Sequence, residues 1–330
     1  MSPPPWSQRR ERGNVRLVRL MIRLSLRFGW GTGQLLIYPI ALYFFLFSRH
    51  ARAASRGFLA RVLSRAPNAS DVLRHIFTYS CVLFDRIFLL ADRTDGFVID
   101  EAGLAELTNT LAQSRGCLLF GAHLGSFEAL RCFGRQSPVA VKVLMYRDNG
   151  GPYTNLVEAL DPSLWQDIID IGKPDSMLRV RESLQRGEMV GILADRAPGG
   201  DRMLAVPFLG APAAFPTGPL RLAAALGAPV VLFFGIRTAP RRYTVYFEHF
   251  ADRVALDQGD RAAQTAMWLQ RYTRRLEEYC RRYPFNWFNF YDFWDDRPQS
   301  SAAPESPQVR STAVPVSAPG RGSRLSVADR

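Results

Sequence analysis

The residues with the clearest chemical potential lie in the segment G-A-H-L-G-S-F-E, residues 121–128. His123 follows an apolar run that we predict to be a strand, which places it at a carboxyl end, where α/β folds form their sites. Glu128 falls in the first turns of a predicted helix, and its carboxylate can fold back toward the imidazole. A carboxylate on one ring nitrogen would fix the tautomer and leave the other nitrogen free to take a proton from a hydroxyl. On spacing alone, a structural histidine with Glu128 facing the helix dipole is an equally open interpretation.

Three further segments place polar side chains at predicted strand or loop ends. Arg147 and the pair Asp195–Arg196 each follow a predicted strand, and Thr217 stands where a helix is expected to begin. An arginine in such a place can bind a phosphate or polarise a carbonyl oxygen. Each arginine also fits an ordinary surface ion pair, and Thr217 also fits a helix cap.

Several common catalytic and cofactor patterns do not occur in the sequence. Ser126 is not in a G-x-S-x-G nucleophile elbow, and there is no Walker A phosphate loop. Gly29, Gly31 and Gly33 have the wrong spacing for a dinucleotide-binding motif. These absences disfavour hydrolase, kinase and dehydrogenase functions. The four cysteines lack C-x-x-C spacing, so they predict neither a zinc site nor a disulfide framework.

The elements that must position these residues follow from short apolar runs that alternate with helical stretches. This alternation predicts an α/β fold, with a mixed sheet covered by helices. Asp71 is expected to cap a helix within the long helical stretch that precedes the sheet. We expect strands at 117–120, 139–145, 168–171, 189–193, 230–234 and 243–247, and helices at 53–92, 102–114, 126–134, 175–186, 217–226 and 260–282.

The net charge of +12 is concentrated near the N-terminus, where residues 1–70 hold twelve arginines against the single Glu11. Four of these arginines recur at helical spacing over residues 15–27, with leucine and methionine largely on the other faces. Such a helix suits the headgroup layer of an anionic membrane. A nucleic-acid arm would be more polar, so we expect no nucleic-acid partner. A basic face packed on the body is the alternative.

An uncharged run over residues 28–47 is, at about twenty residues, just long enough to span a bilayer. Three glycines and Pro39 interrupt it, and arginines flank both ends. A simple span would put one basic flank on the wrong side of the membrane. We therefore prefer a dipping or kinked insertion with both ends cytoplasmic, and a single span is the alternative.

These features divide the chain into three parts. Residues 1–60 form a predicted basic, amphipathic and hydrophobic membrane-anchoring segment, and residues 61–297 a predicted catalytic domain. The tail at 298–330 is rich in Ser, Pro, Ala, Gly and Arg with few large apolar residues. Such a composition cannot bury enough surface to fold, so we expect disorder there.

The order of six motifs makes the chain recognisable. They are G-A-H-L-G-S-F-E, M-Y-R-D-N, G-I-L-A-D-R, F-L-G-A-P-A-A-F-P-T-G-P, G-A-P-V and W-F-N-F-Y-D-F-W. Together they resemble the bacterial lysophospholipid acyltransferase superfamily, in the branch of the lipid A late acyltransferases. The chain looks most similar to predicted acyltransferases linked to aryl-polyene lipids, from about residue 6 to residue 297.

The resemblance implies an acyltransferase that transfers groups other than aminoacyl groups, in one step and with no metal or organic cofactor. It implies that His123 deprotonates the acceptor and that Glu128 orients His123. Arg147 matches the second motif of the superfamily, and Asp195 and Arg196 match a polar pair of the lipid A branch. Thr217 stands in the motif where glycerolipid enzymes carry a glutamate. This departure argues against a plain glycerol-phosphate acceptor.

The implied donor is a fatty or polyene acyl thioester of acyl carrier protein or coenzyme A, and the implied acceptor is a hydroxyl or amine of a lipid. The expected location is the cytoplasmic face of the inner membrane. Two rival functions stay open: a lipid A acyltransferase acting on a phosphorylated disaccharide, and a non-enzymatic membrane-binding homologue. The aromatic run 287–294 either closes the active site or packs in the core.

Overall fold

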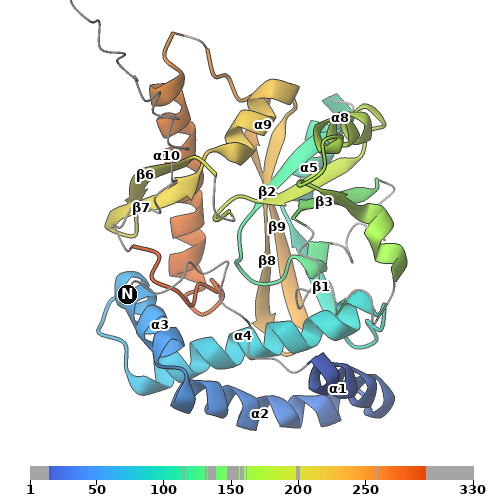
Figure 1. Cartoon of the computed structure of the whole chain (residues 1–330), viewed down its shortest axis with the longest axis vertical. Helices are drawn as coiled ribbons and strands as arrows, with labels where there is room; N and C mark the ends of the chain where they lie inside the picture. The colour runs from blue at the N-terminus through green and yellow to red at the C-terminus, as the bar shows by residue number, and fades with distance from the viewer. Residues whose placement is uncertain are drawn as a thin grey trace, which may run out of the picture.

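The computed structural model of the chain describes residues 15–113, 116–130, 132, 139–146, 156, 160, 162–197, 201–257 and 259–294, with side chains of helix residues given from residue 22 onward. These residues form a central seven-stranded sheet with helices on both faces and a separate two-stranded hairpin beside it (Figure 1). The predicted mixed α/β fold is confirmed. The predicted tail at 298–330 lies outside the described residues.

The sheet has the strand order β1-β9-β8-β2-β5-β3-β4. All neighbouring pairs are parallel except β8 and β9, which form a long antiparallel hairpin. The carboxyl ends of β8, β2 and β5 therefore meet at one edge, where the site motifs lie. The strands are β1 (Val98–Ala102), β2 (Cys117–Gly121), β3 (Val141–Met145), β4 (Ile168–Asp170), β5 (Met189–Leu193), β8 (Val230–Ala239) and β9 (Arg242–Ala251).

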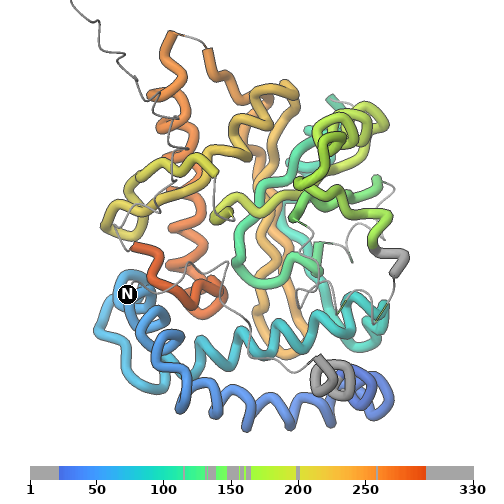
Figure 2. Tube along the Cα trace, in the orientation of Figure 1, coloured from blue at the N-terminus to red at the C-terminus, as the bar shows by residue number. Residues whose placement is uncertain are grey.

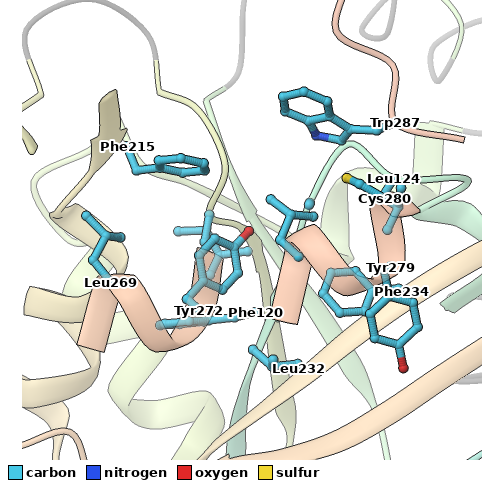
Figure 3. Close-up of a cluster of buried hydrophobic side chains, with 14 of the residues drawn as sticks. Phe120, Leu124, Phe215, Leu232, Phe234, Leu269, Tyr272, Tyr279, Cys280 and Trp287 are labelled. Atoms are coloured by element: carbon cyan, nitrogen blue, oxygen red, sulfur yellow. The ribbon is translucent and has the colours of Figure 1, made fainter. Parts of the chain in front are cut away.

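Side chains of the buried central strands alternate between two cores. Leu118 and Phe120 of β2 pack on one face, and Leu119 packs on the other face with Leu107. Figure 3 shows the first core, in which Tyr272 and other α10 side chains lie against the sheet. The helices and the hairpin that flank the sheet are α5 (Leu104–Gln113), α8 (Ser176–Gln185), α9 (Gly218–Leu226), α10 (Arg261–Arg282), β6 (Met203–Phe208) and β7 (Ala211–Pro216), with a 3-10 turn at Pro162–Asp167.

Four helices precede the sheet: α1 (Val15–Phe28), α2 (Trp30–Phe47), α3 (Arg49–Val62) and α4 (Ala69–Leu90). In Figure 1, α4 lies across the lower ends of β8 and β9, and α2 runs beneath α4. Figure 2 shows the segment after α10, in red, passing beside the blue α3. The predicted domain boundary at residue 60 falls inside α3, whose Phe58 shares a core with the sheet.

The long helical stretch predicted over 53–92 is divided between α3 and α4. Asn68, rather than Asp71, is the N-cap of α4, and Asp71 is its reciprocal partner. The Asn68 side chain accepts from the Asp71 N–H at 3.0 Å, and Asp71 accepts from the Asn68 N–H at 2.8 Å. This capping box satisfies backbone donors that a helix start leaves unpaired. The prediction that Asp71 is the N-cap was therefore wrong, although Asp71 does belong to the capping box at this helix start.

A buried carboxylate joins α2 and α4 to the sheet. Asp85 of α4 is fully buried and accepts from Arg237 Nε at 3.1 Å, from Tyr243 Oη at 2.8 Å and from Trp30 Nε1 at 2.7 Å. Three donors from three elements compensate for the loss of hydration of this one charge. The start of α2 is therefore fixed to the folded body.

Replacing Asp85 with asparagine is expected to lower the free energy of unfolding by about 3–5 kcal/mol, because Arg237 then keeps a buried, unpaired charge. Chemical denaturation measures the loss. Asp252→Asn is the control, because Asp252 is 88% exposed in its pair with His249 and should shift stability by no more than about 0.5 kcal/mol. Equal effects from the two changes would contradict a structural role for the Asp85 cluster.

Candidate active site

The register of two parallel strands brings His123 next to Asp195. Gly121 at the end of β2 pairs with Leu193 at the end of β5, and the Ala194 N–H donates to the Gly121 carbonyl at 2.9 Å. His123 and Asp195 each lie two residues beyond this pair. Residues at equal distances past paired strand ends leave the sheet side by side. The sheet thus positions the histidine and a carboxylate that is far away in the sequence.

Asp195 holds the His123 ring by its Nδ1 atom. The Nδ1–Oδ1 distance is 2.8 Å, and Oδ2 of Asp195 accepts from the backbone N–H of His123 at 3.1 Å and from Trp287 Nε1 at 3.2 Å. Asp195 is fully buried, whereas the His123 side chain is 38% exposed. The carboxylate therefore fixes the ring from the protein side, and no described residue makes a hydrogen bond to Nε2.

The charges around the pair favour a neutral imidazole and an ionised carboxylate. Burial and the nearby guanidinium of Arg196 lower the pKa of His123, while Asp195 opposes that shift. Burial raises the pKa of Asp195, but His123 and Arg196 outweigh it and hold that pKa well below its usual range. At neutral pH the ring carries its proton on Nδ1, facing Asp195. The lone pair of Nε2 is then available to accept a proton.

Glu128 has different partners from those we predicted. Its Oε2 accepts from Ser126 Oγ at 2.9 Å, and its Oε1 lies 2.7 Å from Arg86 Nε of α4. Glu128 is 2% exposed. The place that we predicted for its carboxylate, on a ring nitrogen of His123, is taken by Asp195. Glu128 instead fixes the turn that follows His123 and compensates the charge of Arg86.

The segment after α10 closes the other side of the pair. Its Phe288 N–H donates to the His123 carbonyl at 2.9 Å, and Leu124 pairs with Trp287 in an antiparallel bridge. Figure 3 shows the Trp287 indole close to Leu124. Arg196 donates from its Nη2 to the Phe288 carbonyl at 2.9 Å and lies 3.5 Å from Asp195 Oδ2. Both interpretations of the aromatic run are correct for Trp287, because it is fully buried and also contacts the site.

Gly125 makes the turn after His123 possible. Its φ is +74°, and a Cβ at this position would lie 1.9 Å from the Gly235 carbonyl oxygen of β8. Only glycine tolerates both the backbone conformation and the close approach. The Ser126 N–H then donates to the same carbonyl at 2.7 Å. This contact fixes the loop between His123 and Glu128 against the sheet.

The structure does not unite all of the predicted site residues. His123, Asp195 and Arg196 lie together, with Glu128 on the adjoining turn. Thr217 stands at the N-cap position of α9, but its Oγ1 donates to the Arg202 carbonyl at 3.1 Å instead of capping the helix. Arg147 lies outside the described residues. Within those residues, no group of three His, Cys, Asp or Glu side chains is arranged to hold a metal ion.

A partly exposed histidine held by a buried carboxylate at the carboxyl ends of parallel strands, with the second ring nitrogen open, suits general-base chemistry. Comparison with known families gives the class of enzyme: the family model of bacterial lipid A biosynthesis acyltransferases matches residues 86–295. This match covers more than half of the chain, so the protein belongs to that family. It is an acyltransferase of the lipid A acyltransferase type. No curated protein matches the chain.

Proposed function

We propose that the protein transfers a fatty or polyene acyl group from a thioester donor to a hydroxyl or amine of a lipid acceptor, with His123 as general base. The observation that carries this proposal is the His123 Nδ1–Asp195 hydrogen bond of 2.8 Å, with the ring partly exposed. An ionised Asp195 orients the ring and stabilises the imidazolium that forms. Glu128 fixes the turn after His123 through Ser126, and Arg196 lies 3.5 Å from the Asp195 carboxylate.

The reaction needs few protein groups because a thioester is already activated. Nε2 of His123 takes the proton of the acceptor as its oxygen or nitrogen attacks the thioester carbonyl. The tetrahedral intermediate expels the thiolate, which recovers the proton from the imidazolium. The acyl group ends on the acceptor, and a free thiol leaves on acyl carrier protein or coenzyme A. Positioning of the two substrates supplies much of the acceleration.

The test is a comparison of lipid extracts by mass spectrometry. A strain lacking the gene receives the wild-type protein or the His123→Ala variant. We expect only the wild type to restore species heavier by one acyl group, and their headgroup identifies the acceptor. A phosphorylated disaccharide among them would give the protein a lipid A acceptor. Equal restoration by both proteins would refute His123 as the base, and no change with either would refute lipid acylation.

We further propose that α2 lies in the plane of the membrane, with the protein at the cytoplasmic face of the inner membrane. Among the described residues, α2 alone is long and apolar enough to cross a bilayer. One of its faces is buried through Gly33, Ile37 and Ala41, and α2 packs along α4. The rest of the helix surface exposes Leu35 and Phe47, among other large apolar side chains. A helix packed lengthwise on the body suits insertion into one leaflet better than a span.

The charges at the two ends of α2 agree with this orientation. Arg23 and Arg27 before it are exposed, as is Arg49 after it. Because α1 and α3 both pack on α2, the basic groups at its two ends belong to one folded body, which supports placing both of them on the same side of a bilayer. Arg52 donates to the last carbonyls of α2, including that of Leu46 at 2.6 Å. The anionic inner leaflet is a suitable partner for such a surface.

Replacing Leu35 and Phe47 with aspartate is expected to weaken binding to vesicles of phosphatidylethanolamine and phosphatidylglycerol by at least about tenfold, because two exposed apolar side chains lose their burial in lipid. These side chains are 68% and 66% exposed in the protein. Met267→Asp is the matched control, since Met267 is 54% exposed on α10. Cosedimentation measures binding. Unchanged binding of the double variant would exclude the α2 face as the membrane contact.

A further inference from the structure

A buried chain of hydrogen bonds leads from the N-terminal helices to the carboxylate of Asp195. Ser55 Oγ of α3 lies 2.9 Å from His75 Nδ1 of α4, and His75 Nε2 lies 2.9 Å from the Trp287 carbonyl oxygen. The indole of the same Trp287 donates to Asp195 Oδ2 at 3.2 Å. Ser55, His75 and Trp287 are all fully buried. One tryptophan is therefore held at its backbone by His75 and holds Asp195 with its side chain.

The chemistry of the two ends fixes the protonation of His75. A carbonyl oxygen only accepts, so Nε2 must carry the proton and donate it to Trp287. Nδ1 then accepts from the hydroxyl of Ser55. Burial lowers the pKa of His75 to about 4, so the ring stays neutral at physiological pH. Both ring nitrogens are thus used by structural partners, and His75 itself is not available as a base.

The packing around His75 holds this tautomer in place. Its ring lies against Phe58, Phe288 and Phe290 with centroid distances of 5.5, 6.2 and 4.9 Å. The Phe288 N–H also donates to the His123 carbonyl, so the segment that contains Trp287 and Phe288 is bonded both to His123 and to Asp195. A rotation or shift of Trp287 would therefore displace both His123 and Asp195. A misplacement of about 1 Å can cost as much as 100-fold in rate.

We infer that His75, supported by Ser55, is a positioning residue for acyl transfer, acting through Trp287 on Asp195. This inference rests on the proposed function of His123 and Asp195 and adds residues that touch no substrate. The loss of the His75 bond leaves the Trp287 carbonyl with the Asn289 N–H, at 3.1 Å, as its one remaining donor among the described residues, and loosens the indole. Asp195 then loses one of its donors and holds the His123 ring less firmly.

His75→Phe tests the inference, because phenylalanine keeps an aromatic ring but removes both hydrogen bonds. The assay uses a palmitoyl thioester of acyl carrier protein as donor and the bacterial lipid extract as acceptor, with release of the thiol as readout. We expect kcat to fall roughly 10- to 100-fold, with little change in the KM for the donor. His75→Gln restores much of the rate, because its amide can still donate to the Trp287 carbonyl. Ser55→Ala gives a smaller fall of the same kind.

The acid limb of the pH profile of kcat/KM separates positioning from simple loss of folded protein. Asp195 raises the pKa of His123, whereas burial, Arg196 and Arg86 lower it. A weaker hold by Asp195 therefore lowers that pKa, and the acid limb moves to lower pH in His75→Phe and in Ser55→Ala. The control Phe250→Leu alters a buried core residue at the far end of β9 and should change stability without moving the limb.

A normal kcat per folded molecule, together with an unmoved acid limb, in His75→Phe would overturn the inference. If His75→Phe does not fold, the same result in Ser55→Ala would overturn it. Activity that survives His123→Gln would instead refute the proposed function, so the two failures are distinguishable.

Discussion

Replacing His123 with glutamine is expected to lower the rate of acyl transfer by about 10²- to 10⁴-fold. Glutamine can keep a hydrogen bond to Asp195 but has no basic nitrogen to take the proton of the acceptor. The side chain is partly exposed at the edge of the sheet, so the fold should tolerate the change. The measurement is thiol release per folded enzyme, with His249→Gln as control, because the His249 side chain bonds only to the exposed Asp252 among the side-chain hydrogen bonds described.

The pH dependence of the wild type gives an independent check on the same residue. The base must be neutral, so kcat/KM should be at a plateau above the pKa of His123 and fall as the pH drops through it. That pKa is lowered from 6.5 by burial and by Arg196. The fall should therefore lie below pH 6.5, and His123→Gln should abolish it. A limb above that value, or one that survives in the variant, would exclude His123 as the titrating base.

Much of the fold was predictable because its buried strands are continuous apolar runs. β5 was predicted at its observed bounds, Met189–Leu193, and β2 within one residue. β1 was missed because its sequence V-I-D-E-A is half exposed and carries two acids at the edge of the sheet. The β6–β7 hairpin was missed because prolines and alanines hide its alternation. In each missed case, pairing with a neighbour rather than local propensity decides the structure.

The site was only partly predictable, because sequence distance is a poor guide to its contacts. Glu128 was selected because it follows His123 closely, but Asp195 reaches the imidazole from 72 residues away. That contact depends on β2 and β5 being neighbours, which no local pattern reveals. His75 has no chemical motif around it, and its partner Trp287 is 212 residues away. Its role became visible only with the hydrogen bonds of the folded chain.

The geometry assigns the orientation of the His123 ring to Asp195 and not to Glu128, and substitution of each carboxylate tests this assignment. Asp195→Asn is expected to lower kcat by about 10⁴-fold, the loss known when the aspartate of a serine-protease triad becomes asparagine. An amide nitrogen facing Nδ1 would force the proton onto Nε2, so the base would point its N–H at the acceptor. Binding of the donor should change little, because Asp195 is fully buried and cannot touch it.

Glu128→Gln is the matched comparison, since Glu128 is also buried but bonds to Ser126 and Arg86. This change removes the 2.7 Å ion pair between Glu128 and Arg86, which we expect to lower the free energy of unfolding by about 1–3 kcal/mol. The fall in kcat per folded molecule should be much smaller than for Asp195→Asn. Rates and denaturation curves for both variants decide the matter. If Glu128→Gln proved the more damaging to kcat, the orienting role would return to Glu128, and the Asp195 bond would be structural.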